Sequence, residues 1–405
     1  MSATTPPVVL PGWWPDVLRQ FLGIADFTAR SLAPFAAPLA RLSDTLNDVD
    51  ARRASTSAYM RDSRLRLAYQ LYYLSVNLLK PRWALNELYP SGPPAGHEPF
   101  RVLDLGCGPG TGVAAMHAWA ADVRSTRRIH VDGIDAVEAN VARFRELGAL
   151  LSAESGSPVD CDAWKGDATR PVTSATPYEV VMAMNLLNEI PETRHPHVLA
   201  RCGAVLRPGG VLLLIEPALR ETTRPLLRLR DRAVRSGWTV MLPCHRQGAC
   251  PALENEKDWC HHSLPWERPP FIAFLDEAIG NVKTSLKFSC IVLRNDAATD
   301  VRIPAEEGGT EASGDRDSFG MDRERLRVVS EPFVEKGRRS CYCCGASGRR
   351  LYQRNDRDRS DVNAAFDLVT RWDSIDVRGA EPRRHDVKIT AETRVRAVTS
   401  HPADR

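Results

Sequence analysis

The chain has 405 residues, of which 43% are hydrophobic, so it can bury a main domain core and carry additional parts. Its formal net charge of +3 is too small to define a partner from total charge alone. No apolar run reaches the roughly 20 residues of a membrane span, and residues 1–11 lack the pattern of a secretory signal. We therefore expect a cytoplasmic monomer with reduced cysteines and no membrane partner.

Residues 1–95 have the pattern of an N-terminal helical region. Apolar residues recur at a spacing of three to four from Val17 to Leu22 and again from Leu65 to Leu79. The proline- and glycine-rich segment from Tyr89 to Pro94 interrupts this pattern, and we interpret it as a domain boundary.

Residues 96–294 alternate short apolar runs with amphipathic stretches, which predicts an α/β fold with a doubly wound sheet. The predicted strands are Phe100–Leu105, Ile129–Asp135, Glu179–Met184, Val211–Glu216, Thr239–Leu242 and Phe288–Leu293, with a weaker strand before Asp167. The predicted helices are Val113–Ala121, Val137–Leu151, Pro196–Leu206 and Pro225–Ser236. The last two strands have no predicted helix between them, which indicates an antiparallel hairpin at the sheet edge with a cysteine-rich insertion at 243–268.

A glycine loop follows the first predicted strand. Gly106, Gly108 and Gly110 allow a sharp turn into the next helix and a close approach of a ligand to the backbone. Dinucleotide-binding enzymes share such glycines, but Asp104 stands two residues before the first one, where it can accept a ligand's amino group. The spacing Asp-x-Gly-x-Gly-x-Gly resembles the class I S-adenosylmethionine-dependent methyltransferases and their Rossmann fold.

Three further polar residues follow predicted strands in the order expected for a nucleoside pocket. Asp135 can accept hydrogen bonds from ribose hydroxyls, and Asp167 from an adenine amino group. Asn185 begins the segment after the fourth strand, where many such enzymes place catalytic groups. No catalytic constellation can be assigned, so whether methyl transfer occurs stays open.

Cys244, Cys250 and Cys260 lie in the insertion, whose low apolar content gives them no core to fill. Such cysteines are typical of thiolate ligands to a soft metal, which needs a fourth ligand. The candidates are a local histidine (His245, His261 or His262) or the distant Cys341, Cys343 or Cys344. The spacings differ from the Cys-x-x-Cys of zinc ribbons, which favours an iron–sulfur cluster and leaves zinc as the alternative.

The remaining chain divides by composition. Residues 295–322 are polar and acidic, and we predict a flexible linker. Residues 323–378 are predicted to form a small basic C-terminal module, with strands at Leu326–Val329 and Arg349–Gln353. Residues 379–405 are predicted to be a disordered tail.

Five motifs, taken in chain order, resemble those of a known family. They are the glycine loop, Leu187-Asn188-Glu189, the Cys-x5-Cys-Pro from Cys244 to Pro251, Asp258-Trp259-Cys260-His261 and Lys287-Phe288-Ser289. It is the family of methyltransferase-like assembly factors of the mitochondrial small ribosomal subunit and their bacterial relatives, over roughly residues 50–375. The resemblance implies binding to small-subunit ribosomal RNA and a four-cysteine 4Fe-4S cluster.

Residue by residue, the resemblance assigns Cys244, Cys250 and Cys260 as the first three cluster ligands and Cys344 as the fourth. The basic residues Lys336, Arg338 and Arg339 match a stretch that implies contact with the RNA backbone. The leading hypothesis is thus a ribosome assembly factor with an S-adenosylmethionine pocket and a cluster. The alternatives are an active methyltransferase acting on ribosomal RNA or another substrate, and a small-molecule methyltransferase with a zinc-stapled lid.

Overall fold

The computed structural model describes residues 7–47, 62–96, 98–170, 172, 174, 176–281, 283–296 and 323–398. The N-terminal region is helical, as predicted, and forms α1 (Trp14–Leu22), α2 (Ala29–Asn47) and α5 (Ser63–Leu88). The side chain of Asp62 accepts hydrogen bonds from the amides of Arg64 and Leu65, and so caps the first turn of α5. Apolar residues of α1 and α5 join the same core as strands β1 and β2 described below.

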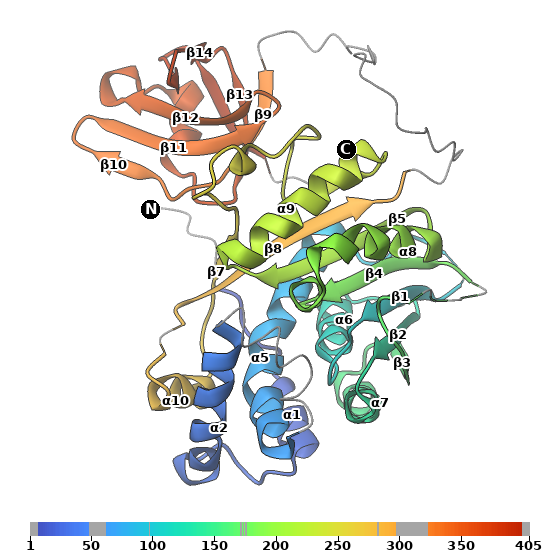
Figure 1. The fold of residues 1–405 in the computed structure, drawn as a ribbon. Helices are drawn as coiled ribbons and strands as arrows, with labels where there is room; N and C mark the ends of the chain where they lie inside the picture. Colours follow the sequence, from blue (N-terminus) through green and yellow to red (C-terminus); the bar gives the residue numbers. More distant parts are fainter. Residues whose placement is uncertain are drawn as a thin grey trace.

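The central sheet has the order β3-β2-β1-β4-β5-β8-β6, with β7 paired to the outer part of β8 (Figure 1). Its strands are β1 (Phe100–Leu105), β2 (Ile129–Asp135), β3 (Val159–Lys165), β4 (Tyr178–Met184), β5 (Leu206–Pro217), β6 (Thr239–Leu242), β7 (His262–Pro265) and β8 (Ser285–Arg294). The first five strands run parallel, and β8 lies antiparallel between β5 and β6. The predicted doubly wound sheet and the antiparallel pairing of the last two predicted strands are both confirmed.

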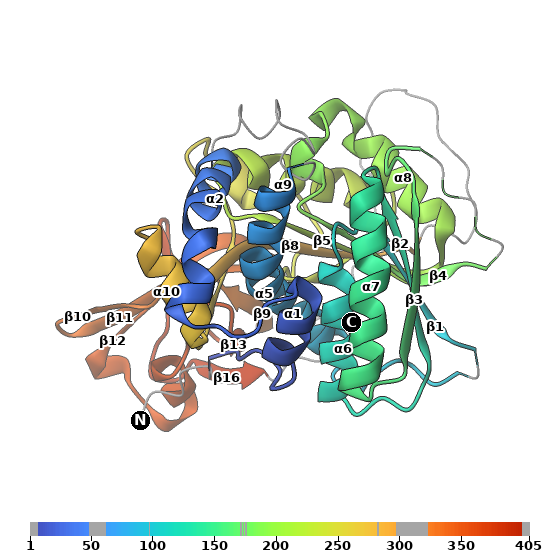
Figure 2. The same cartoon turned by 90° about the horizontal axis from the view of Figure 1, so that it is seen from below.

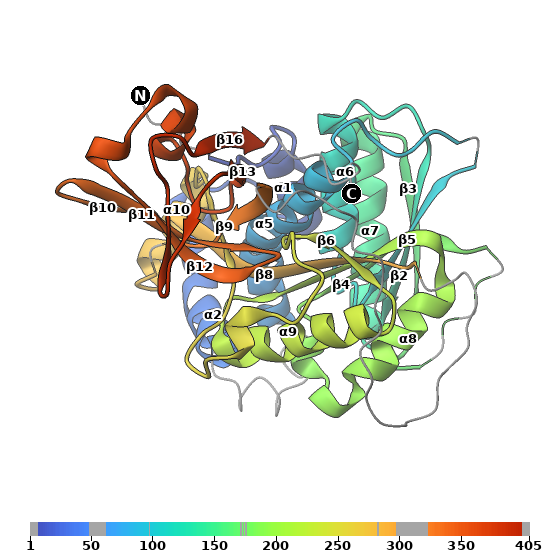
Figure 3. The ribbon, with the colours of Figure 1, turned by 90° about the horizontal axis from the view of Figure 1, so that it is seen from above.

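Helices cover the two faces of this sheet. Helices α6 (Thr111–Asp122) and α7 (Glu138–Ser155) lie on one face, and the N-terminal helices pack beside them (Figure 2). Helices α8 (His195–Val205) and α9 (Arg220–Arg235) lie on the other face, against β5 and β8 (Figure 3). Helix α5 packs beside α6, and some of its side chains border a cavity at the carboxyl ends of the parallel strands.

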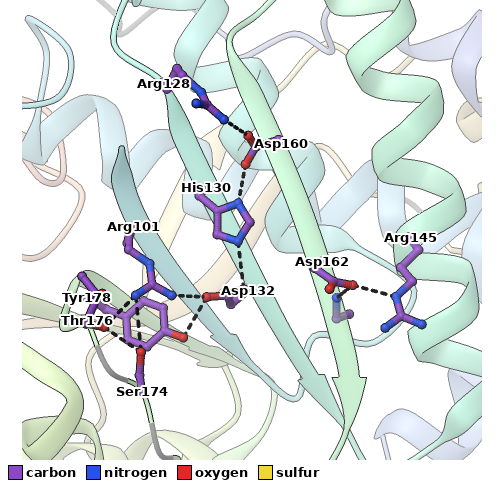
Figure 4. A network of polar contacts seen from close by, with 11 residues as sticks. Arg101, Arg128, His130, Asp132, Arg145, Asp160, Asp162, Ser174, Thr176 and Tyr178 are labelled. Atoms are coloured by element: carbon purple, nitrogen blue, oxygen red, sulfur yellow. Dashed lines mark hydrogen bonds and ion pairs between the residues drawn. The ribbon is translucent and has the colours of Figure 1, made fainter. Parts of the chain in front are cut away.

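The described residues between β3 and β4 form no helix, and the sheet face beside them is polar. His130 shares its two ring nitrogens between Asp132 and Asp160, and Arg101 and Tyr178 also bond to Asp132 (Figure 4). The hydrogen bond with Asp132 raises the pKa of His130 to about 9, and Asp160 adds to this against the effect of partial burial. Ion pairs and hydrogen bonds therefore satisfy the polar groups on a sheet face that a crossover helix would otherwise cover.

The insertion between β6 and β8 contains structure that the sequence did not predict. Besides β7, it includes helix α10 (Pro270–Ala278), which packs against α2, and Phe271 of this helix stacks on Phe27 just before α2. Pro269 and Pro270 begin this helix, where a missing amide hydrogen costs nothing.

The C-terminal residues form a second sheet of order β14-β15-β12-β11-β9-β13-β16, with β10 paired to β11 (Figure 1). Its strands are β9 (Arg323–Val328), β10 (Phe333–Glu335), β11 (Arg338–Gly345), β12 (Gly348–Asn355), β13 (Ser374–Arg378), β14 (Glu381–Pro382), β15 (Asp386–Lys388) and β16 (Arg394–Val398). The prediction of disorder from residue 379 is wrong up to Val398. Val387, Ile389 and Val395 are buried in the module's core, although polar neighbours mask their pattern in the sequence.

Of the predicted linker at 295–322, the structure describes residues 295 and 296, and the rest lies outside the described residues. Within the part of the chain that is described, no helix has both the length and the hydrophobicity to cross a membrane.

Candidate functional site

The glycine loop turns from β1 into α6 at the carboxyl edge of the sheet. Gly106, Gly108 and Gly110 have φ values of 69°, 53° and 113°, in the left-handed region that favours glycine. A Cβ at Gly106 would lie 2.9 Å from the Leu186 side chain, so the loop also has no room for one. The loop borders a narrow cavity of about 30 Å³ that Asn185 closes from the end of β4.

Asp104 is fully buried directly before this loop. No described group makes a hydrogen bond of good geometry to either of its carboxylate oxygens. Burial, followed by the charge of Asp135, raises the pKa of Asp104 to about 7. A buried carboxylate without a partner is costly, and a cationic ligand group would relieve that cost.

The other two predicted carboxylates have different surroundings. Asp135 accepts hydrogen bonds from the amides of Gly108 and Val137, at 2.9 and 2.8 Å, and so braces the glycine loop. Asp167 is exposed and accepts hydrogen bonds from the amide and hydroxyl of Thr169 in its own turn. Asp104 and Asp135 therefore lie together behind the glycine loop, whereas Asp167 lies apart, and none of the three carboxylates lines the narrow cavity itself.

The segment after β4 is held by Glu216 at the end of β5. Its carboxylate accepts hydrogen bonds from the Leu187 amide and from the Asn188 amide and side chain. Burial raises the pKa of Glu216 to about 7, although these three hydrogen bonds lower it. Asn185, just before this segment, has a φ of 54°, a left-handed conformation that asparagine tolerates.

Helix α5 contributes a wall of the glycine-loop cavity that the sequence did not reveal. Tyr69, Asn77 and Lys80 line it, and Lys80 Nζ donates a hydrogen bond to Asn77 Oδ1 at 2.7 Å. These residues lie on the N-terminal helix, about 30 residues before the loop, and no motif marked them. Only the packing of α5 across the sheet edge brings them to the pocket.

The predicted cluster ligands line a second cavity, of about 260 Å³, between the insertion and the C-terminal module. Cys244, Cys250 and Cys260 border it from the insertion, and Cys344 from β11. Cys290 on β8, which is buried, also borders this cavity. Among the described residues, no three His, Cys, Asp or Glu side chains are close enough together to hold one metal ion.

The alternation of side chains along β11 separates the three C-terminal cysteines. Cys341 and Cys343 are fully buried in the module's own core, with their sulfurs 3.6 Å apart. Cys344 points to the opposite side and borders the cavity. Of the histidines considered as a fourth ligand, His261 and His262 also border the cavity, and His245 bonds instead to Ser374 at 2.9 Å.

Thiols and guanidinium groups share the walls of this cavity. Burial raises the pKa of Cys250 and of Cys344 to about 12, and the Cys244 sulfur adds to both effects. Five arginines border the same space: Arg230, Arg246, Arg327, Arg349 and Arg371. Because a metal binds the thiolate rather than the thiol, these cations would offset the charge that deprotonation creates.

Arginines also fix the insertion to both neighbouring parts of the molecule. On α9, the buried Arg230 donates to the carbonyls of Arg246 and Gly248, and its neighbour Asp231 accepts from the Cys250 amide. From the C-terminal module, Arg327 donates to the Pro243 carbonyl and Arg371 to the His261 carbonyl, each at 2.9 Å.

Aromatic rings and an ion pair complete the contact between the module and the insertion. Trp372 stacks on His262 with ring centroids 3.9 Å apart, and Arg349 pairs with Asp258. The cysteine segment is therefore the contact surface through which the module meets the α/β domain.

The predicted RNA-contacting residues lie on the β10–β11 hairpin. Lys336 and Arg338 are exposed, and Arg338 pairs with Glu335. Arg339 instead donates to the carbonyls of Phe366 and Val369 inside the module. Phe333 and Val334 on β10 are 46% and 72% exposed, so apolar side chains stand beside the basic ones on this hairpin.

The sheet order and the glycine loop at the end of β1 define a class I S-adenosylmethionine-dependent methyltransferase-like α/β fold, with N-terminal helices and a C-terminal β region. This confirms the predicted fold class. The chain belongs to the family described as mitochondrial small ribosomal subunit Rsm22, whose model matches residues 63–355. The resemblance noted in the sequence is thereby confirmed, and the family's description associates it with the small ribosomal subunit.

Other proteins share parts of the fold. A ubiquinone biosynthesis O-methyltransferase of Bordetella avium is 32% identical over 110 residues, which cover 27% of this chain and 39% of that relative. The plantazolicin methyltransferase BpumL in complex with S-adenosylhomocysteine is 11% identical, with a TM-score of 0.36 over 63% of this chain and 99% of that one. A putative class I methyltransferase of Listeria monocytogenes is also 11% identical, with a TM-score of 0.35 over 72% and 91%.

Proposed function

We propose that this protein is an assembly factor of the small ribosomal subunit that holds S-adenosylmethionine in the glycine-loop pocket and a 4Fe-4S cluster in the cysteine cavity. One observation carries the proposal. Three cysteines of the insertion and one cysteine of the C-terminal module, about 80 residues later in the chain, border the same cavity. A cluster bound to all four would join the two parts covalently through metal–sulfur bonds, and its binding free energy would stabilise their arrangement.

The cavity fits a cluster better than a single zinc ion. Four thiolates around one zinc lie about 3.8 Å apart, given Zn–S distances of about 2.3 Å and tetrahedral geometry. The described side chains do not converge to such a site, whereas the four cysteines are among the residues that border a cavity of about 260 Å³. A 4Fe-4S cluster places its four cysteine ligands at the corners of a larger body. The surrounding arginines suit its thiolate charge.

The glycine-loop pocket fits the amino acid end of S-adenosylmethionine. Asp104 would accept the ligand's ammonium group, since neither of its oxygens has another partner in the described chain. The amides at the start of α6 face the position that a carboxylate would take. Gly106, Gly108, Gly110 and Asn185 would form the walls, and Asp135 would support the loop or bind the ribose. When bound, S-adenosylmethionine supplies an activated methyl group.

The exposed β10–β11 hairpin is the part of the module best suited to RNA. Lys336 and Arg338 would neutralise backbone phosphates, and Phe333 offers a ring on which a base can stack. Arg339 is committed to the module's interior, so it would contribute to the hairpin's position rather than to RNA contact.

Cosedimentation with small ribosomal subunits tests the assembly function. The anaerobically purified wild-type protein should sediment with immature small subunits, and a Lys336→Glu, Arg338→Glu variant should lose this at moderate salt. A Lys257→Glu variant, altered at an exposed lysine outside the hairpin, is the control and should sediment like the wild type. Failure of the wild type to bind subunits or their RNA would refute the assembly function.

Methyl transfer is a second candidate, favoured by a cavity of about 340 Å³ that adjoins the glycine-loop pocket. Incubating small subunits with radiolabelled S-adenosylmethionine and either the wild type or an Asp104→Ala, Gly106→Arg variant tests it. Methylation by the wild type alone would support an active enzyme, and equal label with both proteins would exclude it for this substrate.

A further inference from the structure

The larger cavity beside the glycine-loop pocket has an unusual set of charges. Its walls come from α2, α5, the segment after β4, residues 217–219 and the start of β8. Three lysines line it, Lys80, Lys283 and Lys287, and the same three line a neighbouring cavity of about 260 Å³. One carboxylate, Glu189, borders the larger cavity. The lysine site, defined as these three residues, therefore has an excess of positive charge.

Among the described residues, Lys80 and Lys283 contact neutral groups rather than carboxylates. Lys80 donates a hydrogen bond to Asn77, and the Lys283 ammonium lies over the Tyr72 ring, 4.7 Å from its centroid. Burial, and then the charge of Lys283, lowers the pKa of Lys80 to about 7. Asp276 is the carboxylate that acts on Lys283, but it is already paired with Arg268 and accepts a hydrogen bond from Tyr72. An anion placed between the two ammonium groups would reduce their repulsion and restore the charge of Lys80.

Aromatic and amide groups lie next to these lysines. Tyr69 and Tyr73 stack with ring centroids 5.2 Å apart and both border the cavity. The amide side chains of Asn185 and Asn188 border it from the segment after β4. A planar ring with polar edges matches this wall, because an aromatic face supports stacking and amides can both donate and accept hydrogen bonds.

We propose that this cavity is a binding site for a phosphorylated nucleotide, with the phosphate at the lysine site and the base against Tyr69 and Tyr73. The nucleotide is either free or part of an RNA strand, and both sources share the same chemistry. Four residues, Tyr69, Asn77, Lys80 and Asn185, border both this cavity and the glycine-loop pocket. The bound nucleotide would therefore lie beside the ligand of the glycine loop. The inference deepens the second candidate function, because it names an occupant for the cavity that favours methyl transfer, but nucleotide binding itself depends on neither the cluster nor subunit binding.

Calorimetric titration of the full chain tests the proposal. Saturating S-adenosylhomocysteine keeps nucleotides out of the glycine-loop pocket, and the probes are CMP, UMP, the nucleosides cytidine and uridine, and inorganic phosphate. A short RNA with and without a 5′-phosphate distinguishes a free nucleotide from a strand. The variants are Lys80→Met and Lys283→Met, which keep side-chain length, with Lys257→Met as the control. Thermal unfolding of each variant checks that it is folded.

We expect CMP and UMP to bind more tightly than the nucleosides, and each lysine variant to weaken nucleotide binding by roughly tenfold or more, as the loss of a charge-assisted contact does. The control variant should bind like the wild type. If nucleosides bind as tightly as nucleotides, or if folded Lys80→Met and Lys283→Met variants keep wild-type affinity, the phosphate assignment is wrong. The absence of binding by any phosphorylated probe, RNA included, would overturn the proposal as a whole.

Discussion

The glycine-loop pocket and the cysteine cavity are built in opposite ways. The first is bordered by one continuous turn, Gly106 to Thr111, together with α5 and the ends of β4 and β5, and is only about 30 Å³. The second is about 260 Å³ and is assembled from α9, the insertion, β8 and the C-terminal module. A continuous turn keeps its shape through local backbone geometry, whereas an assembled cavity depends on every contact that holds its parts together. The two sites should therefore respond to different mutations.

The largest effect on one site without the other is expected from a substitution at Asp104. An Asp104→Asn substitution should weaken binding of S-adenosylmethionine by about 100-fold, because it removes the carboxylate that pairs with the ligand's ammonium group. The iron content of the Asp104→Asn protein should equal that of the wild type, since the cysteine cavity shares no residue with the glycine loop. Calorimetry and elemental analysis of the same preparation measure both effects. Loss of iron together with S-adenosylmethionine binding would show that the sites are not independent.

The same substitution should make the ligand-free protein more stable at high pH. The pKa of Asp104 is about 7 in the folded chain against an ordinary 3.8. The folded state thus binds the proton more tightly, and this carboxyl lowers stability as pH rises from about 4 to 7. Asp104→Asn should be more stable than the wild type by about 1–3 kcal/mol at pH 8, with little difference at pH 4, in urea unfolding. A variant less stable than the wild type at pH 8 would contradict the burial argument.

The next largest effect concerns the contacts that position the insertion. Arg230→Met should destabilise the protein by about 3 kcal/mol, because it leaves Asp231 and two carbonyls without their buried donor. Arg228, two residues earlier on α9, is the matched control because its side chain is 46% exposed and pairs with Glu192 at the surface. Arg228→Met should cost under about 1 kcal/mol. Equal losses in urea unfolding would mean that Arg230 has no special structural role.

The difference between the sites also explains what the sequence could predict. Strands β1, β2 and β6 have the predicted bounds, because short segments rich in apolar residues and bounded by turns are local signals. The glycine loop is equally local. Lys80 and Arg230 left no such signal, since their roles arise only from how α5 and α9 pack. The strands from β14 to β16 were missed because they are short and rich in charge.

The choice among the three C-terminal cysteines shows the same limit. Residue spacing alone left Cys341, Cys343 and Cys344 as alternatives, and only the family resemblance assigned Cys344. Once β11 is a strand, neighbouring residues must point to opposite sides, and Cys344 alone of the three borders the cavity. The pairing of β11 with β9 and β12 decided this, and pairing is not a local property.

The smallest effect is expected far from both pockets. His130→Gln should destabilise the protein by roughly 1 kcal/mol at pH 6, by breaking the ion pairs with Asp132 and Asp160. The pKa of His130 is raised to about 9 from an ordinary 6.5, so its contribution is complete below about 6.5 and is lost as pH rises through 9. Urea unfolding at pH 6 and pH 10 should show the difference between variant and wild type shrinking. A difference that grows with pH would contradict this assignment. Ligand binding by the variant and the wild type should be the same at both pH values.

The central claim is that thiols from two distant parts of the chain hold one cluster, and a comparison of adjacent cysteines tests it most directly. The visible absorption spectrum, iron and sulfide content of anaerobically purified wild type, Cys344→Ser and Cys343→Ser should be measured together. We predict a broad band near 400 nm and about four irons per chain in the wild type and Cys343→Ser, and loss of both in Cys344→Ser. A wild type with zinc and no iron, or a Cys344→Ser variant with an unchanged spectrum, would contradict the claim.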